Sequence, residues 1–342
     1  MRVLVTGHQG YLGSVMVPVL LAHGHSVTGL DSGLFADCVL GAPPDDPPTL
    51  CLDVREVTAA HLTGFDAVVH LAALSNDPLG YLEPQITYEI NHAASVRLAR
   101  CAKAAGVRRF LYASTCSVYG AAGSEPVDEN APLRPLTPYA ESKVRVEDDV
   151  AAMADSGFSP VFLRNATAFG FSPRLRADIV LNNLVGHAVL TGKVKVLSDG
   201  TPWRPLVHAR DIARAFARCL EAPADTIHCH AFNVGSEMNN RTVADIARAV
   251  VDTVPDSTLM ITGEYGADPR SYRVDFGAAR TELDFEAEWS IADGAAELYE
   301  HYTLAGLTAE DFDERFTRLA RLETLRRTGA LDDSMRRVTS AA

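Results

Sequence analysis

The feature that most constrains the fold is a glycine-rich segment at residues 7–13, with the sequence GHQGYLG, placed directly after a short apolar run. Residues 2–6 are apolar and β-branched, as in a buried strand, and residues 12–22 are apolar over the length of a helix. The glycines therefore predict a strand-to-helix turn, where backbone N–H groups and the positive end of the helix can hold a pyrophosphate. The spacing is GxxGxxG rather than GxGxxG. The residues expected to contact the ligand here are Gly7, Gln9, Gly10, Tyr11, Leu12 and Gly13.

Further strands alternate with helices along the chain. Apolar runs predict strands at residues 26–30, 49–52, 66–71, 109–113 and 160–164. Helical patterning covers residues 84–105, and another helix begins at Pro138. Strands that alternate with helices predict a parallel sheet in the α/β class, with ligands beyond the carboxyl ends of the strands.

Acidic residues follow two of these strands. Asp31 ends the second strand and can accept hydrogen bonds from the hydroxyls of an adenosine ribose. Its charge would repel a 2′-phosphate, and no arginine follows it directly, so NAD is favoured over NADP as the cofactor. Asp53 and Val54 follow the third strand, where a side chain can meet the adenine edge.

A tyrosine and a lysine four residues apart indicate redox chemistry. Tyr139 and Lys143 lie one turn apart on one face of the predicted helix. A free tyrosine keeps its proton to about pH 10, but the nearby ammonium group favours the phenolate, so Tyr139 can act as a general base on an alcohol. Ser114, Thr115 and the residues after them place hydroxyl and thiol groups at the end of the fifth strand, near this phenol.

Composition narrows the partners. The chain has 342 residues and a formal charge of -13, which argues against binding to nucleic acid or to an anionic membrane. No apolar stretch reaches 18 residues and no signal-like segment precedes the first strand, so we expect a cytoplasmic protein. Cys229 lies between His228 and His230, but alternate residues of a strand point to opposite faces, so no metal site is expected.

Taken together, these motifs resemble those of the extended short-chain dehydrogenase/reductases, in the NAD-dependent nucleotide-sugar epimerase/dehydratase family. The resemblance covers residues 1 to about 300. The matching elements, in the order of the family, are GHQGYLG, Asp31, Asp53-Val54, HLAA at residues 70–73, Asn91, STCSVYG at residues 114–120 and YAESK at residues 139–143.

The resemblance implies a Rossmann-like doubly wound parallel sheet with a smaller C-terminal substrate-binding domain. We expect the NAD-binding domain at residues 1–168, completed by about 205–235, and the substrate-binding domain at residues 169–204 and 236–305. Residues 306–342 form a helical tail, which Thr308 can cap and which packs on its own subunit or on a partner. Family members commonly form homodimers through a four-helix bundle, to which the helix with Tyr139 would contribute. The apolar face of the tail consists of Phe312, Phe316, Leu319, Leu322 and Leu325.

The resemblance also implies the roles of individual residues. Thr115, Tyr139 and Lys143 form the catalytic group, and Lys143 also binds the nicotinamide ribose. Asn91 supports the helix and the water network behind Lys143. The further NAD contacts that the family pattern places on this chain are Leu71, Ala72, Ala73 and Asn91.

The nucleotide-sugar site falls on the second half of the chain. Arg204, in a basic segment of the family, is expected to bind the substrate diphosphate. The family has asparagine at the position of Thr167, whereas this chain has Asn165 two residues earlier. The arginine usual before Asp268 is absent, and Arg270 or Arg273 can replace it. The expected substrate contacts are Ser75, Thr115, Cys116, Ser117, Asn165, Thr167, Arg204, Arg270 and Arg273.

Four readings of the function remain open at this point. The first is an NAD-dependent nucleotide-sugar epimerase, acting at C4 of the sugar, because a recycled cofactor suits Asp31 and NAD. The second is an NAD(P)H-dependent keto-sugar reductase. A dehydratase ranks third, because the family's Asp-Glu pair is replaced by Cys116 and Ser117, although Asp77 offers another carboxyl. The fourth is a sensing or scaffolding protein without chemistry, which would be expected to lose Tyr139 or Lys143.

Overall fold

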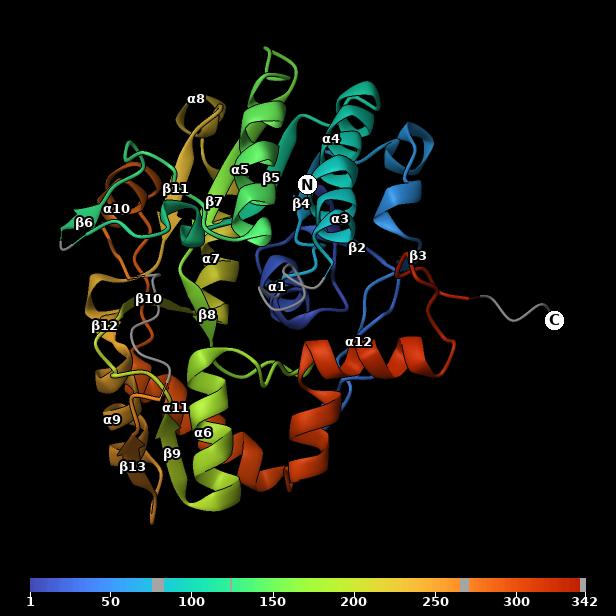
Figure 1. The fold of residues 1–342 in the computed structure, drawn as a ribbon. Helices are drawn as coiled ribbons and strands as arrows, with labels where there is room; N and C mark the ends of the chain where they lie inside the picture. Colours follow the sequence, from blue (N-terminus) through green and yellow to red (C-terminus); the bar gives the residue numbers. More distant parts are fainter. Residues whose placement is uncertain (76–82, 124, 265–270, 339–342) are drawn as a thin grey trace.

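A seven-stranded parallel sheet forms the centre of the fold in the computed structural model, which describes residues 1–75, 83–123, 125–264 and 271–338 (Figure 1). Its strand order is β11-β7-β5-β4-β1-β2-β3, and every neighbouring pair is parallel. The strand order reverses between β1 and β4, and this switch point is where open α/β sheets bind ligands. The expected Rossmann-like α/β fold is confirmed. The strands are β1 (Arg2–Thr6), β2 (Ser26–Asp31), β3 (Thr49–Cys51), β4 (Ala67–His70), β5 (Arg109–Thr115), β7 (Ser159–Asn165) and β11 (Ala231–Val234).

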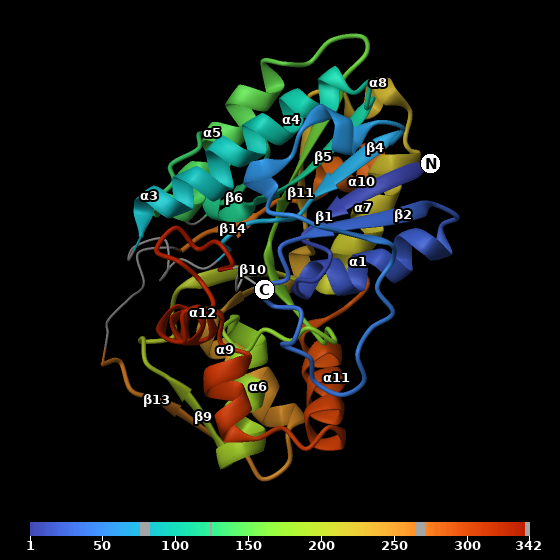
Figure 2. The same ribbon diagram turned by 90° about the vertical axis from the view of Figure 1, so that its right-hand side faces the viewer.

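Helices cover both faces of this sheet (Figure 2). Alternate residues of a strand point to opposite faces, so Val3 and Val5 enter one buried cluster while Leu4 enters another. The first cluster includes residues of α1 (Tyr11–Ala22) and α7 (Ala209–Glu221), and the second includes residues of α4 (Ala94–Ala104) and α5 (Pro138–Ala151). Apolar alternation along the strands therefore decides which helices lie on which face.

A third buried cluster lies below the carboxyl edge of the sheet (Figure 1). It is built mainly from helices and strands in the second half of the chain, as expected for a smaller domain, although the exact domain division remains a prediction. Its larger elements are α6 (Val180–Thr191), β9 (Lys193–Val196), α9 (Val243–Thr253), β13 (Thr258–Ile261) and α11 (Ile291–Leu304). Shorter elements between or beside the domains are β6 (Pro126–Val127), β8 (Thr167–Phe169), β10 (Trp203–His208), α8 (Ala224–Ile227), β12 (Asn240–Thr242), β14 (Arg273–Val274) and α10 (Gly277–Leu283).

The helix expected at residues 84–105 is interrupted. Residues Pro84–Thr87 form α3, residues Tyr88–Ala93 form a wider π-helical turn, and α4 follows. Wider turns of this kind are frequent at functional sites because the extra residue redirects a side chain. The turn contains Asn91, whose side chain hydrogen-bonds backbone next to the pocket described below.

The C-terminal tail is also not one continuous helix. A π-helical turn at Asp311–Arg315 and α12 (Arg318–Arg327) meet at Thr317. The break lets Phe312 and Phe316 enter the third cluster while Leu322 and Leu325 enter the second. The tail thus packs on its own subunit and spans both parts of the fold. Among the described residues, no helix has the length and apolarity needed to cross a membrane.

A buried ion pair ties α5 to the sheet. Arg164 on β7 and Glu147 on α5 are 2.7 Å apart, and their side chains are only 8% and 6% exposed. Glu147 also accepts a hydrogen bond from Ser114, and Arg164 donates one to the Tyr119 hydroxyl at 3.1 Å. These bonds fix the helix that carries Tyr139 against β5 and β7.

Replacing Glu147 with alanine should therefore leave the Arg164 guanidinium buried without its carboxylate. The expected loss in the free energy of unfolding is about 3–5 kcal/mol, measured by denaturant titration. Asp148→Ala, at the next and exposed position of the same helix, serves as control and should cost less than about 0.5 kcal/mol. Equal midpoints for the two variants would contradict this role of the pair.

Candidate active site

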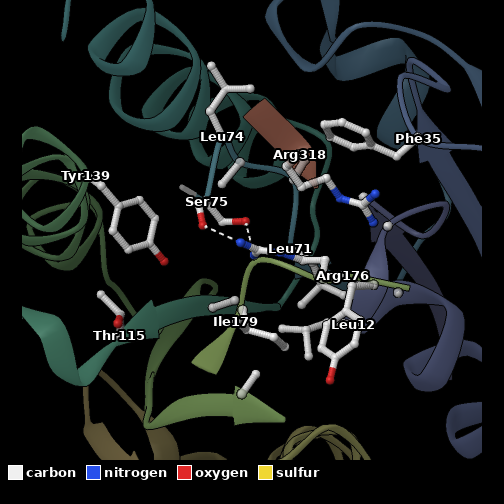
Figure 3. A pocket seen from close by; sticks show the side chains of 18 of the residues that line it. Leu12, Phe35, Leu71, Leu74, Ser75, Thr115, Tyr139, Arg176, Ile179 and Arg318 are labelled. Carbon is white, nitrogen blue, oxygen red and sulfur yellow. Dashed lines mark hydrogen bonds between the residues drawn. The ribbon is translucent and has the colours of Figure 1, made fainter. Parts of the chain in front are cut away.

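A cavity of about 620 Å³ opens at the carboxyl ends of the parallel strands, at the switch point of the sheet (Figure 3). Its wall includes the glycine-rich turn after β1, the ends of β2, β4 and β5, and Tyr139 and Lys143 of α5. The segment after β8 and two parts of the C-terminal tail complete the wall. Motifs far apart in the sequence therefore meet around one space.

The glycine-rich turn fits a dinucleotide. Gly7 has a φ of +74°, and a Cβ there would lie 2.8 Å from the backbone nitrogen of Ala72. A Cβ on Gly13 would lie 2.3 Å from the carbonyl oxygen of Gly7, so the turn and α1 approach closely only without side chains. Gly10 and the two residues after it also line the cavity. Gln9 does not, because its side chain hydrogen-bonds Asp46, and its expected cofactor contact stays a prediction.

Asp31 and Asp53 lie at the expected adenosine end of the cavity. Asp31 accepts hydrogen bonds from the N–H groups of Gln9 and Gly33 at 3.0 and 2.8 Å, which orients its carboxylate. The carboxylate of Asp53 is bound by the Arg55 guanidinium at 2.7 Å. Burial raises the pKa of Asp53, but the hydrogen bonds and charge of Arg55 outweigh it and hold that pKa below its usual value. Val54 also lines the cavity.

A buried chain of hydrogen bonds holds the loop after β4. His70 contacts the hydroxyls of Thr6 and Ser95 at 2.6 and 2.7 Å, and burial, with Lys143 nearby, lowers the pKa of His70 to about 3. Asn91 binds the N–H and carbonyl of Leu74 at 2.8 and 3.0 Å. Residues 71–75 then line the cavity, as expected for Leu71, Ala72 and Ala73. Asn91 itself does not line the cavity, so its expected cofactor contact stays a prediction, while its two hydrogen bonds hold the backbone of this loop.

Lys143 and Tyr139 extend from α5 toward the end of β5. Lys143 is 3% exposed, and its Nζ donates a hydrogen bond to the carbonyl of Ala113 at 2.7 Å. The same nitrogen lies 4.6 Å from the centre of the Tyr112 ring and 5.6 Å from that of Tyr139. Burial lowers the pKa of Lys143 to about 7, against the opposing attraction of Glu147. An amine that is partly protonated at neutral pH therefore lies beside the Tyr139 ring, and Figure 3 shows Tyr139 and Thr115 on the same wall.

The residues after β5 point in different directions. Thr115 and Ser117 line the cavity, and the Thr115 hydroxyl accepts a hydrogen bond from the N–H of Ser117 at 3.1 Å. Cys116 is fully buried, and its thiol donates to the carbonyl of Arg164 at 3.0 Å. The short 3₁₀ turn at Cys116–Tyr119 directs this side chain into the core, and its expected substrate contact stays a prediction.

Several expected substrate residues do share the cavity. Ser75, Thr167, Arg204 and Asn165 line it. The Oδ1 atom of Asn165 is buried and has no hydrogen-bond partner among the described residues, as expected for an atom that accepts from a ligand. Arg273 does not line the cavity and lies over the Trp203 ring at 4.9 Å, and its expected substrate contact stays a prediction. Predictions for Asp77, Asp268 and Arg270 fall outside the described residues.

Sequence reasoning missed Arg176. Its guanidinium pairs with Asp178 at 2.9 Å and donates to the Ser75 hydroxyl at 2.9 Å, inside the cavity (Figure 3). A charged R-x-R-x-D run at residues 174–178, directly before the apolar helix α6, was the available signal. It also missed the tail residues of the wall, Arg318, Leu322 and Met335. In the described part of the chain, no group of three or more His, Cys, Asp or Glu residues is placed to hold a metal.

Comparisons with known proteins match this geometry. A family model described as the NAD dependent epimerase/dehydratase family matches residues 3–235. Over 317 residues the chain is 31% identical to the UDP-glucose 4-epimerase of Mycolicibacterium smegmatis, covering 88% of this chain and 98% of that protein. The structure of MoeE5 with UDP-glucuronic acid and NAD is 27% identical, with a TM-score of 0.76 over 89% of this chain and 100% of its own. DesIV, a dTDP-glucose 4,6-dehydratase from Streptomyces venezuelae solved with NAD, is 26% identical, with a TM-score of 0.76 over 89% and 97%.

The buried lysine makes stability depend on pH. Its pKa is about 7 in the fold against 10.5 for a free lysine, so between these values the unfolded chain binds more protons. The free energy of unfolding of the NAD-free protein should therefore rise relative to that of Lys143→Met as pH increases from 7 to 10. Denaturant titrations at both pH values measure this difference. Lys193→Met changes an exposed lysine and should show no such trend; a pH-independent difference for Lys143→Met would contradict the burial of its charge.

Proposed function

This chain belongs to the NAD dependent epimerase/dehydratase family, and we propose that it is a nucleotide-sugar 4-epimerase. As a family member it is an enzyme that uses NAD, and its relatives are epimerases and dehydratases of nucleotide sugars. The UDP-glucose 4-epimerase of M. smegmatis, aligned over 98% of its length, supports the choice of C4 and of a UDP-sugar. The substrate is thus a nucleoside diphosphate linked to a hexose or a related sugar.

The wall of the cavity divides between cofactor and substrate. The glycine-rich turn, Asp31 and residues 71–73 would hold NAD, and Lys143 would bind its nicotinamide ribose. Arg204 and Asn165 would bind the nucleotide sugar on the other side. When bound, NAD supplies an acceptor for the hydride of the sugar carbon and a donor that returns it.

The residues of this chain supply the proton chemistry. The Tyr139 phenol oxygen removes the proton from the C4 hydroxyl, and the charge of Lys143 favours the phenolate that this step needs. Thr115 holds the reacting oxygen of the sugar. The keto-sugar would rotate within the cavity so that the hydride returns to its other face. Tyr139 then returns the proton to the same oxygen, so the product differs from the substrate only in the configuration of this carbon.

The observation that carries the proposal is the small set of acids around Thr115 and Tyr139. Elimination of water from the sugar would need a second acid and base near Thr115. Among the described residues that line the cavity, the carboxylates are Asp31, Asp53 and Asp178. The first two belong to the adenosine end, and the third is paired with Arg176. Inversion of a carbon needs only the proton carrier that Tyr139 provides, which favours epimerisation over dehydration. The expected homodimer and cytoplasmic location remain predictions.

Tyr139→Phe tests the general base. Losing the phenol oxygen should lower kcat by a factor of about 10²–10⁴ and leave the NAD content of the purified protein unchanged. Tyr299→Phe, at a half-buried tyrosine of α11 outside the cavity, is the matched control and should retain full activity. A rate for Tyr139→Phe within a factor of ~2 of wild type would remove this residue from the chemistry.

The reaction itself is tested with purified protein and a panel of UDP-, dTDP-, GDP- and CDP-sugars, by mass spectrometry with separation of isomers. We expect a new isomer of unchanged mass, without net consumption of NAD or NAD(P)H. Among the sugars of the panel, we expect a UDP-hexose to be the substrate that is converted. Loss of one water would instead establish a dehydratase. A gain of two hydrogens that requires reduced cofactor and a keto-sugar would establish a reductase.

A further inference from the structure

The C-terminal segment lies against the adenosine end of the cofactor cavity. We call residues 316–338 the C-terminal strap. Its residues Arg318, Leu322 and Met335 line the same cavity as Asp31 and Val54. The family match ends at residue 235, and the solved relatives cover 89% of this chain and 97–100% of their own. About a tenth of this chain therefore lies outside the part aligned with those structures.

Arg318 is a buried cation whose hydrogen bonds are incomplete. It is 5% exposed, its Nη2 donates to the carbonyl of Arg174 at 3.3 Å, and its guanidinium lies 4.3 Å from the centre of the Phe35 ring. Among the described residues its Nη1 is buried and has no hydrogen-bond partner, although the Cys38 thiol and the Asp178 carboxylate both act on the charge of the guanidinium. Burial lowers the pKa of Arg318 to about 10, so it remains charged at neutral pH.

The position of this guanidinium identifies the missing partner. Figure 3 shows Arg318 next to Phe35, on the side of the cavity that also carries Leu12. Leu12 belongs to the glycine-rich turn, which holds a pyrophosphate in folds of this type. A buried arginine that lines the cavity and has a donor to spare can be complemented by the phosphate oxygens of a ligand held at that turn. Phosphate binding would also offset the cost of the buried charge.

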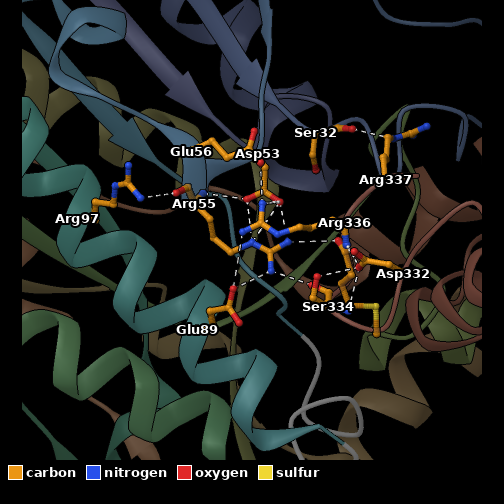
Figure 4. A network of polar contacts seen from close by, with 11 residues as sticks. Ser32, Asp53, Arg55, Glu56, Glu89, Arg97, Asp332, Ser334, Arg336 and Arg337 are labelled. Atoms are coloured by element: carbon orange, nitrogen blue, oxygen red, sulfur yellow. Dashed lines mark hydrogen bonds and ion pairs between the residues drawn. The ribbon is translucent and has the colours of Figure 1, made fainter. Parts of the chain in front are cut away.

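The end of the strap is tied down at the same rim (Figure 4). Arg55 donates to the carbonyl of Ser334 at 2.8 Å while it also binds Asp53 and Glu89. Arg337 donates to the carbonyl of Ser32 at 2.8 Å and to that of Gly33. The strap is thus bonded to Ser32 and Gly33, which follow Asp31, and to Arg55, two residues after Asp53, at the expected adenosine site.

Met335 lies between these two anchors. It is 2% exposed, lines the cavity and has a φ of +59°, which non-glycine residues rarely adopt. The bonds of Asp332 to the N–H groups of Ser334 and Arg336, at 2.9 and 2.8 Å, hold this turn. The hydrogen bonds of this turn therefore place the apolar side chain of Met335 in the cavity wall.

We propose that the C-terminal strap is part of the NAD site: Arg318 binds the diphosphate of NAD, and residues 322–337 cover its adenosine. Release of the cofactor then requires two sets of hydrogen bonds to break: the bond from Arg55 to Ser334 of the strap, and the bonds from Arg337 of the strap to Ser32 and Gly33. A cofactor retained in this way suits an enzyme that returns its hydride within each turnover. The inference rests on NAD being the cofactor, as in the proposed function.

Arg318→Met tests the phosphate contact, because methionine fills the buried space without charge. Isothermal titration of NAD-free protein should show the Kd for NAD and for ADP-ribose raised by roughly ten- to a hundredfold, as for a lost hydrogen bond to a charged group. The Kd for adenosine, which has no phosphate, should not change. Arg318→Lys keeps the charge and should lie between wild type and Arg318→Met. The matched control is Arg327→Met, at the exposed end of the same helix.

A titration with UDP distinguishes the two diphosphates that can occupy the cavity. An unchanged Kd for UDP together with a raised Kd for NAD supports the assignment to the cofactor. A larger loss for UDP than for NAD, or a Kd for NAD equal to that of Arg327→Met, would overturn it. Thermal melting of each variant identifies those that fold.

Arg337→Ala tests the anchoring of the strap without changing any residue of the cavity wall. Losing its bonds to Ser32 and Gly33 should speed the release of NAD by about tenfold, measured by displacement with excess ADP-ribose, and lower the NAD that remains after dialysis. An unchanged rate of NAD release would contradict the inference that the strap retains the cofactor. Wild-type protein that binds NAD but converts no nucleotide sugar would contradict only the proposed function, since these measurements need no turnover.

Discussion

The buried ammonium group of Lys143 is the constraint on which the active-site geometry depends. Burial disfavours its charge, and the carbonyl of Ala113 and the rings of Tyr112 and Tyr139 offset only part of that cost. These contacts come from β5 and α5, so the helix can only lie where its lysine reaches the strand end. Tyr139 is thereby placed on the same cavity wall as Thr115.

Other buried charges join segments that are distant in sequence. The pair between Glu147 and Arg164 links α5 to β7, and the hydrogen bond from Arg176 to the Ser75 hydroxyl links the segment before α6 to the loop after β4. Removing one member of such a pair leaves an uncompensated charge, so a displacement that separates the partners is costly. The cavity is therefore bordered by elements that are each held in place by electrostatics as well as by apolar packing.

Much of the cofactor half was predictable because its signals are local. A glycine turn between an apolar strand and a helix, and a tyrosine one helical turn from a lysine, each follow from a few adjacent residues. No comparable signal in the sequence shows in which direction each side chain of a turn points. Cys116 and Ser117 are neighbours of similar size, yet only the 3₁₀ turn after β5 decides that Ser117 faces the cavity and Cys116 the core. The π-helical turn at Asn91 is equally invisible, because helical periodicity continues through it.

The sequence by itself determined the class of the fold, the order of its motifs and the cofactor, and it placed Tyr139 and Lys143 one helical turn apart, since these depend on spacing within single elements. Only the tertiary structure decided which residues border the cavity from afar, namely Arg176 with its partner Asp178 and Arg318 with the strap. Arg318 is 287 positions from Asp31, and an amphipathic helix records only that it has a buried face, not what that face covers. Long-range placement depends on how three buried clusters pack together, which no local pattern encodes.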